Sequence, residues 1–170
     1  MKISVLLFVV LFVSQACARR KRPKACRTCP VGWTFWGNAC YRIFNNPIST
    51  WDHAEASCNG YSLKQKKRRL TGHLAAITSS EENTFVLDLW RSIRGDTGLW
   101  LGYNDKKVEG TFVDGEGVAP KFTFWDSDEP NDREGEDCVG MWNTDANQDN
   151  GSWNDFPCEN QYAFVCKISR

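Results

Sequence analysis

The sequence predicts one domain that mixes helices with short strands and carries a long, loop-rich region in its second half. Two capped, amphipathic segments are typical of helices, and several short apolar or aromatic runs are typical of strands. A long stretch is dominated by Gly, Asp, Asn and Pro. The 170 residues suit one domain of ordinary size, and the eight tryptophans suit a compact core with an exposed recognition surface.

Residues 1–18 predict a secretory signal peptide. After a positive start, residues 3–13 are apolar apart from Ser4, and Ala16-Cys17-Ala18 is a small-residue cleavage site. The run is shorter than the about 20 apolar residues of a membrane span, and no later stretch qualifies. We therefore expect a secreted, extracellular protein without a membrane span. Residues 19–28 follow as a basic arm, in which residues 19–22 are also typical of a propeptide cleavage site.

The cysteine count suggests disulfides and one cysteine left over. Eight cysteines are encoded, and removal of Cys17 with the signal peptide leaves seven. A secreted chain meets an oxidising compartment, so we expect these thiols to pair. An odd number leaves one for an intermolecular bridge or a free thiol. A zinc site at Cys26 and Cys29 has little support, because no second CxxC or His pair stands at ligand spacing.

The first elements after the arm are expected to be a hairpin and a helix. Residues 31–44 are aromatic, with a Gly-Asn pair between two apolar pieces, which predicts a β-hairpin. Ser49 or Thr50 then stands as an N-cap before residues 51–58, which predict a short helix. Its apolar face is formed by Trp51, Ala54 and Cys58.

A polar, basic stretch at residues 61–71 is interpreted as a loop. Its most cationic part, residues 64–69, leaves two interpretations open. One is an ordinary solvated loop. The other is contact with sulfated glycans or another anionic surface. Residues 74–77 then predict a short apolar strand.

A second helix is expected to follow. Residues 78–82 have the spacing of a capping box at its start, and Gly95 is expected to end it. Its apolar face is expected to be formed by Phe85, Leu89 and Ile93.

The last part of the chain is expected to be two strands on either side of a long loop region. Residues 99–102 predict a buried strand, and residues 162–167 a final one. The intervening residues 105–153 are mostly Gly, Asp, Asn and Pro, with aromatic islands. A loop of this length in a compact domain is normally functional or disordered. The flanking cysteines and tryptophans favour an ordered, functional loop.

Two short segments within and after this loop gather carboxylates and side-chain amides. They are residues 129–137, which are followed directly by Cys138, and residues 153–155, which are followed shortly by Cys158. Ca²⁺ takes about 6–8 oxygen ligands of these kinds. Without a cation, so many carboxylates would repel one another and some would protonate. The alternative is a solvated acidic loop, but the interleaved Asn and Trp residues do not resemble an acidic tail.

Taken together, the ordered motifs resemble those of a C-type lectin domain over residues 29–168. The resemblance implies an α+β fold, with two helices, small antiparallel sheets and a long calcium-binding loop. The matching motifs are Cys29-Pro-x-Gly-Trp33, Trp51-x-x-Ala54-x-x-x-Cys58, Leu74-Ala-x-Ile77, Trp100-Leu-Gly102, Glu129-Pro-Asn131, Glu136-Asp-Cys138, Trp153-Asn-Asp155 with Cys158, and Phe164-Val-Cys166.

The resemblance also implies a pairing of the cysteines. Cys26 then remains for a bridge between chains, and we expect a disulfide-linked homodimer. A local pairing of Cys26 with Cys40, which would leave Cys29 free, is the alternative. The implied bridges within the domain are Cys29–Cys40, Cys58–Cys166 and Cys138–Cys158.

Two calcium sites, and so two or more Ca²⁺ ions, are implied in the same way. The principal site maps onto Glu129, Asn131, Glu136, Asn154 and Asp155. The auxiliary site maps onto Asp105, Glu109, Asp132 and Asp137, with the backbone carbonyl of Glu136 as a further ligand.

In relatives of this kind a vicinal pair of sugar hydroxyls coordinates the ion, so the five principal residues are also the expected sugar-binding residues. Carboxylates accept from the hydroxyls and amides donate to them. The Glu129-Pro130-Asn131 order, with an expected cis bond before Pro130, resembles relatives that prefer mannose, N-acetylglucosamine or fucose. Relatives with Gln-Pro-Asp prefer galactose. Glycans on cell or microbial surfaces are the expected partners, and nucleic acid is not.

The main alternative is a protein of the same fold that binds a protein, ice or a mineral surface and uses calcium only structurally. An enzyme is not expected, because His53 and His73 have no convincing nucleophile partner. Asn150-Gly-Ser152 is an N-glycosylation sequon close to the expected sugar site.

Overall fold

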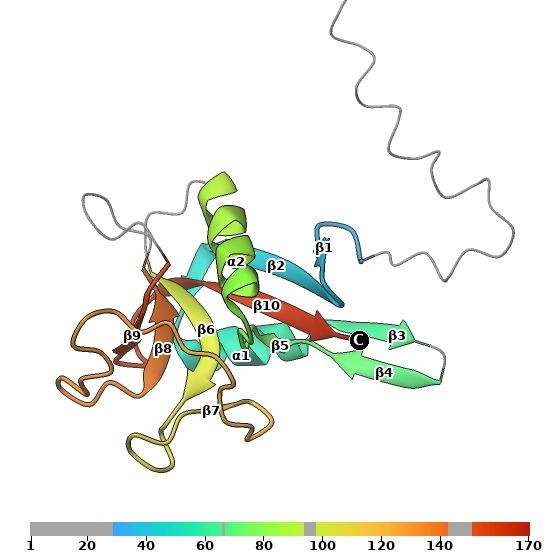
Figure 1. The fold of residues 1–170 in the computed structure, drawn as a ribbon. Helices are drawn as coiled ribbons and strands as arrows, with labels where there is room; N and C mark the ends of the chain where they lie inside the picture. The colour runs from blue at the N-terminus through green and yellow to red at the C-terminus, as the bar shows by residue number, and fades with distance from the viewer. Residues whose placement is uncertain (1–28, 66, 94–97, 143–150) are drawn as a thin grey trace, which may run out of the picture.

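The computed structural model describes residues 29–65, 67–93, 98–142 and 151–170. The expected signal peptide, the expected basic arm with Cys26, the expected helix end at Gly95 and the sequon residue Asn150 lie outside the described residues. The α+β fold expected from the resemblance is confirmed, with a mixed sheet and two helices (Figure 1). Along its main path, the sheet runs β1 (Thr34–Trp36), β2 (Ala39–Ser49), β10 (Tyr162–Ser169), β6 (Leu99–Asn104), β8 (Cys138–Met141) and β9 (Trp153–Phe156).

The N-terminal hairpin and the first helix form as expected. β1 pairs antiparallel with β2, and the turn between them uses Gly37, whose φ of 56° favours glycine. α1 (Trp51–Asn59) begins after Thr50, whose hydroxyl accepts from the backbone N–H of His53. The predicted apolar face of α1 is buried.

The second helix, α2 (Ser80–Ser92), is capped by Ser79, whose hydroxyl accepts from the backbone N–H of Glu82. In a capping box, the Glu82 side chain would also accept from the backbone N–H of Ser79. Here the buried Glu82 carboxylate instead accepts from Lys167 Nζ at 2.6 Å and from the Thr78 hydroxyl at 2.7 Å. The Glu82 side chain therefore links the start of α2 to β10 through Lys167.

The predicted apolar face of α2 is wrong in part. Val86 and Trp90 are fully buried, while Ile93 is 38% exposed and caps the helix end. Phe85 and Leu89 pack against the core but stay partly buried. The buried stripe is therefore rotated from the predicted one, because the neighbouring strands and residues 151–153 cover a different side of the helix.

The interpretation of residues 61–71 as a loop is wrong. They form an antiparallel pair, β3 (Ser62–Gln65) and β4 (Arg68–Thr71), separate from the main sheet. Leu63 and Leu70 lie opposite each other and pack against one of the two hydrophobic clusters. This tertiary contact compensates for a polar sequence that shows little strand pattern by itself.

Two hydrophobic clusters stabilise the domain, and the helices lie on either side of the β2–β10 pair (Figure 1). α2 packs into one cluster and α1 into the other. Two short strands extend the sheet, with β5 (His73–Leu74) on β10 and β7 (Val113–Asp114) on β6. In the part of the chain that the structure describes, no helix has the length and apolar character to cross a membrane.

Three disulfides join the elements, at the pairs that the resemblance implies. Cys29–Cys40 fixes the first described residue to β2, Cys58–Cys166 joins α1 to β10, and Cys138–Cys158 joins the start of β8 to the segment after β9. The last of these closes a 20-residue separation around the site described next.

The long loop expected at residues 105–153 contains a buried strand. All four residues of β8 are buried, and they pair with β6 on one side and β9 on the other. The flanking loops are thereby fixed to the sheet, which positions the acidic segments.

Candidate functional site

The site is built where a loop from residues 126–137 meets β9. Asn154 and Asp155 lie on β9, opposite Gly140 and Val139 of β8. Asn154 is 8% exposed and Asp155 is 1% exposed. Strand pairing and the adjacent disulfide therefore hold two polar side chains in a buried position.

The Asp155 carboxylate is the anchor of the loop. Its Oδ1 accepts from the backbone N–H of Asn131 at 3.2 Å, and its Oδ2 accepts from that of Asp132 at 2.9 Å. The peptide bond between Glu129 and Pro130 is cis, as expected. The turn at residues 129–132 is therefore seated directly on β9.

The side chains of this turn form a carboxylate–amide pair. Asn131 Nδ2 donates to Glu129 Oε2 at 2.6 Å, and Asn131 Oδ1 accepts from the backbone N–H of Arg133 at 2.9 Å. Both ends of the amide have partners, so its orientation is fixed. Glu136 is held near the turn because its backbone N–H donates to Asp132 Oδ1 at 3.0 Å.

The carboxylates here repel one another. The pKa of Glu129 is raised to about 7, first by burial and then by the contact with Asp155 and the charges of Glu136 and Asp126. The pKa of Glu136 is also raised, first by burial and then by the charge of Asp155. A cation among these groups would favour their ionised forms.

Asn154 supplies a second indication of a cation. Its Oδ1 is buried and has no hydrogen-bond partner among the described residues. Buried polar oxygens are normally paired, so this atom calls for a ligand. Amide and carboxylate oxygens are the ligands of Ca²⁺. The donor set therefore fits calcium, and its members are Glu129, Asn131, Glu136, Asn154 and Asp155.

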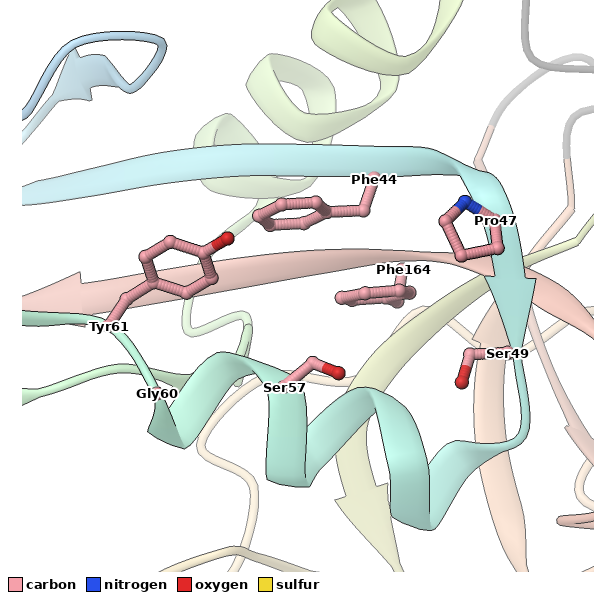
Figure 2. Close-up of a pocket in the computed structure, with 7 residues that line it drawn as sticks. All are labelled: Phe44, Pro47, Ser49, Ser57, Gly60, Tyr61 and Phe164. Atoms are coloured by element: carbon pink, nitrogen blue, oxygen red, sulfur yellow. The ribbon is translucent and has the colours of Figure 1, made fainter.

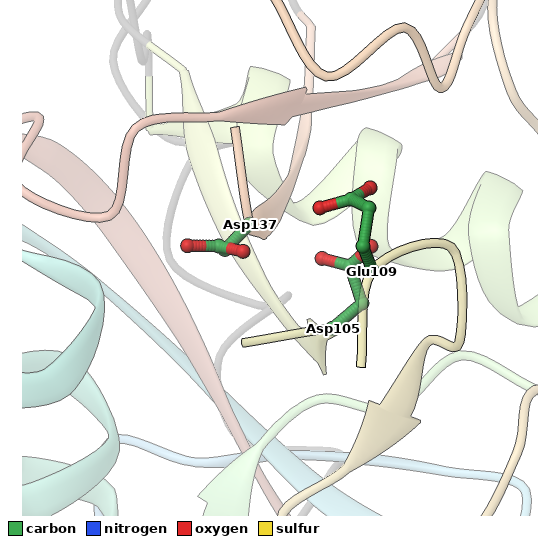
Figure 3. Close-up of side chains that lie close together, drawn as sticks. All are labelled: Asp105, Glu109 and Asp137. Atoms are coloured by element: carbon green, nitrogen blue, oxygen red, sulfur yellow. The ribbon is translucent and has the colours of Figure 1, made fainter. Parts of the chain in front are cut away.

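A second group of carboxylates lies at the end of β6. One oxygen from each of Asp105, Glu109 and Asp137 lies within 4.8 Å of the others (Figure 3). Asp132, the fourth residue expected here, is not part of this group. Its Oδ1 instead accepts from the backbone N–H of Glu136.

Asp105 combines an unpartnered buried oxygen, as in Asn154, with a raised pKa, as in Glu129. It is 1% exposed, and its Oδ1 has no partner in the described part of the chain. Burial raises its pKa to about 6, opposed by a hydrogen bond from the Gly110 N–H and assisted by the charges of Glu109 and Asp137. This donor set also fits a calcium ion.

Two residues near the principal site were not among those expected from the sequence. The charge of Asp126 raises the pKa of Glu129, and its place in the acid-rich stretch was an available signal. Asn83 of α2 accepts from Trp153 Nε1 at 2.7 Å and donates to the Gly151 carbonyl at 3.0 Å. Because Asn83 and Trp153 are 70 positions apart, no local pattern indicates this support.

A different depression lies between β2, β10 and α1. It has a volume of about 470 Å³ and is lined by aromatic rings and hydroxyls (Figure 2). Phe44 stacks on Phe164 with ring centroids 4.9 Å apart, and Ser49 and Ser57 lie at its edge. None of the expected site residues lines it.

Most of the chain is similar to known lectins. The model of the Lectin C-type domain matches residues 48–168. The chain is 40% identical over 139 residues to an alpha-N-acetylgalactosamine-specific lectin of Patiria pectinifera, which covers 81% of this chain and 78% of that protein. It is 34% identical over 146 residues to echinoidin of Heliocidaris crassispina, over 82% of this chain and 96% of the other.

Among solved structures, the C-type lectin CEL-I of Cucumaria echinata superposes with a TM-score of 0.73 and 31% identity, over 83% of this chain and 97% of the other. These relatives are lectins rather than enzymes. The chain therefore belongs to the C-type lectin domain family, a family of carbohydrate-binding domains.

Proposed function

We propose that this protein is a secreted, calcium-dependent lectin that binds glycans on cell or microbial surfaces. The observation that carries the proposal is the seating of the Glu129–Asn131 turn on Asp155, beside the unpartnered Oδ1 of Asn154. This arrangement places carboxylates and amides together in a form that suits both Ca²⁺ and sugar hydroxyls.

The five residues of the principal site would hold one calcium ion, and Asp105, Glu109 and Asp137 a second. When bound, calcium supplies positive charge and coordination positions for a vicinal pair of sugar hydroxyls. Glu129 and Glu136 would accept hydrogen bonds from those hydroxyls. With the unpartnered Oδ1 of Asn154 and the Oδ1 of Asn131 as ligands of the ion, the amide N–H₂ groups of these two residues would donate to the hydroxyls.

For the sugar class, we propose mannose, N-acetylglucosamine or fucose, on the basis of the Glu129-Pro130-Asn131 order. Here the carboxylate of Glu129 precedes the amide of Asn131 along the turn. This order determines which sugar hydroxyl would meet a hydrogen-bond acceptor and which would meet a donor. A second candidate is N-acetylgalactosamine, favoured by the name of the Patiria pectinifera relative. Mannose and N-acetylglucosamine differ from N-acetylgalactosamine in the orientation of the 4-hydroxyl, so competition between free mannose and free N-acetylgalactosamine separates the two candidates.

The experiment is a glycan array probed with calcium and with EDTA, followed by competition with free mannose and free N-acetylgalactosamine. We expect signal on mannose-type glycans only with calcium, and competition by mannose. Competition by N-acetylgalactosamine alone would select the second candidate. Calcium uptake without binding to any glycan would instead support a relative that binds a protein, ice or mineral surface.

The three disulfides suit export, because such bonds persist in oxidising compartments. We also propose that Cys26 links two chains. A single shallow site binds a monosaccharide weakly, at roughly millimolar Kd. Two linked sites raise avidity by roughly 10²–10⁴ when both can engage one surface.

A further inference from the structure

The strands β3 and β4, here called the basic hairpin, form an exposed cationic surface. Figure 1 shows them extending from the body at the end away from β8 and β9. Its cations, Lys64, Lys67, Arg68 and Arg69, are all exposed. No carboxylate occurs in the described residues 62–65 and 67–71, and none of these four cations forms an ion pair within the described chain.

The register of the basic hairpin places like charges together. Lys64 lies directly opposite Arg69, and Ser62 lies opposite Thr71. Since residues two apart on a strand share a face, these four side chains share one face. Like charges opposite each other on a sheet destabilise it. The arrangement is stabilised from the other face by Leu63 and Leu70, which pack against the core.

Two depressions meet at the arginines of β4. One has a volume of about 460 Å³ and is lined by the four cations and Ser62. The other, of about 260 Å³, lies against Arg68, Arg69 and Thr71 and also includes Glu116. The cationic side chains are thus beside hydroxyls at hollowed surfaces rather than on a flat strand.

Other basic groups near the second depression already have acidic partners. Lys167 Nζ lies 2.6 Å from Glu82, and His73 Nδ1 lies 2.7 Å from Glu55. Arg68 and Arg69 are therefore the cations of this lining without an ion pair in the described chain, and they outnumber its one carboxylate, Glu116.

We propose that the basic hairpin binds a sulfated polysaccharide, independently of calcium. Arginine presents a planar fork of N–H donors that matches tetrahedral oxyanions such as phosphate and sulfate. Lys64 adds a point charge, while the hydroxyls of Ser62 and Thr71 can hydrogen-bond to sugar oxygens on the same face. Cations repeated along both strands suit a chain that carries many sulfates.

The surface fits other polyanions less well. Binding of single-stranded nucleic acid relies on aromatic side chains for stacking, and the described residues of the basic hairpin include none. Insertion into a membrane interface needs an exposed apolar face. Leu63 and Leu70, the large apolar residues here, are turned to the core.

The test measures binding of the full chain to immobilised heparin, as the sulfated probe, in EDTA. Binding should persist there, while binding to mannan is lost. If about four cations take part, counterion release of the kind seen with nucleic acids predicts a roughly 50- to 150-fold fall in affinity between about 50 and about 200 mM salt. Heparin binding that requires calcium, or whose affinity does not change with salt concentration, would overturn the proposal.

The variants separate charge from fold. K64Q with R69Q should weaken heparin binding by at least about tenfold, since two charge-assisted contacts are lost. K64R with R69K keeps both charges and should retain binding to within a few fold, as should the distant variant K121Q. Equal loss in the charge-keeping pair would overturn the proposal. Calcium-dependent mannan binding and the thermal midpoint serve as checks of folding.

If K64Q with R69Q does not fold, K67Q with R68Q provides the same test at the turn end of the basic hairpin. Chemically desulfated heparin should bind at least about tenfold more weakly than heparin. Equal binding of the desulfated chain would overturn the proposal. A preference for phosphatidylserine vesicles or for single-stranded DNA over heparin would also overturn it, in favour of that partner.

Discussion

The side-chain amide of Asn131 donates a hydrogen bond of 2.6 Å to Oε2 of Glu129. In the proposed function both groups would instead form hydrogen bonds with sugar hydroxyls. The Asn131 Oδ1 accepts from the Arg133 backbone N–H, which sets which end of the amide donates. The order of acceptor and donor along this turn is therefore a structural property that can be reversed by substitution.

The first prediction concerns that reversal. Exchange of both residues, E129Q with N131D, should move the preference from mannose towards galactose, because carboxylate and amide trade places. The measurement is elution from immobilised mannan and from a galactose resin in calcium. The single variants E129Q and N131D act as controls, and each should weaken both kinds of binding. An unchanged preference for mannose in the double variant would show that this turn does not select the sugar.

The second prediction concerns pH. In the calcium-free chain the pKa of Glu129 is raised from 4.5 to about 7. Between these values the unfolded chain binds fewer protons at this group than the folded chain, so calcium-free stability should rise as pH falls from about 7 to about 4.5. Calcium affinity should change in the opposite direction, because protons compete for the same carboxylates.

Thermal unfolding in EDTA and calcium titrations across this pH range measure the two trends. E129Q is the matched control, and its calcium-free stability should vary less with pH than that of the wild type. The remaining variation should come partly from Asp105, whose pKa is raised to about 6. A calcium affinity that stays constant from neutral pH down to about pH 4 would contradict the assignment of these carboxylates.

The third prediction concerns the support of β9 by α2. N83A should destabilise the domain by about 1–3 kcal/mol, because it leaves the buried Trp153 Nε1 without an acceptor. Calcium affinity should also fall, since Gly151 and Trp153 lead into Asn154. T84A, at the exposed neighbouring position, is the control and should have little effect. Chemical denaturation with and without calcium measures both effects, and equal stability of the two variants would refute this role of Asn83.

The fourth prediction concerns assembly. The protein purified after secretion should run as a dimer on non-reducing electrophoresis, and C26S should run as a monomer. C26S should keep its affinity for free mannose and lose binding to densely glycosylated surfaces, because only avidity is affected. A wild type that runs only as a monomer would exclude the disulfide-linked dimer.

Local sequence patterns predicted the parts of the fold that local interactions determine. The caps at Thr50 and Ser79 mark the starts of both helices, and the buried face of α1 follows helical spacing. The ordered motifs and the resemblance that they support indicated the disulfides and the residues that gather around Asp155. These features depend on short-range chemistry or on spacing that is visible along the chain.

The features that were missed depend on contacts between distant residues. The basic hairpin was interpreted as a loop because its strands are held by the packing of Leu63 and Leu70, not by an apolar pattern. The buried stripe of α2 is set by the elements that cover it. Asn83 supports Trp153 across 70 positions, which only the fold reveals.

The central claim is that sugar binding at this site requires calcium, and isothermal titration of mannose into the protein tests it most directly. With calcium in excess, the titration should give binding at roughly millimolar Kd. After chelation with EDTA the heat should vanish, and it should return when calcium is restored. Mannose binding of unchanged affinity after complete chelation would contradict the claim.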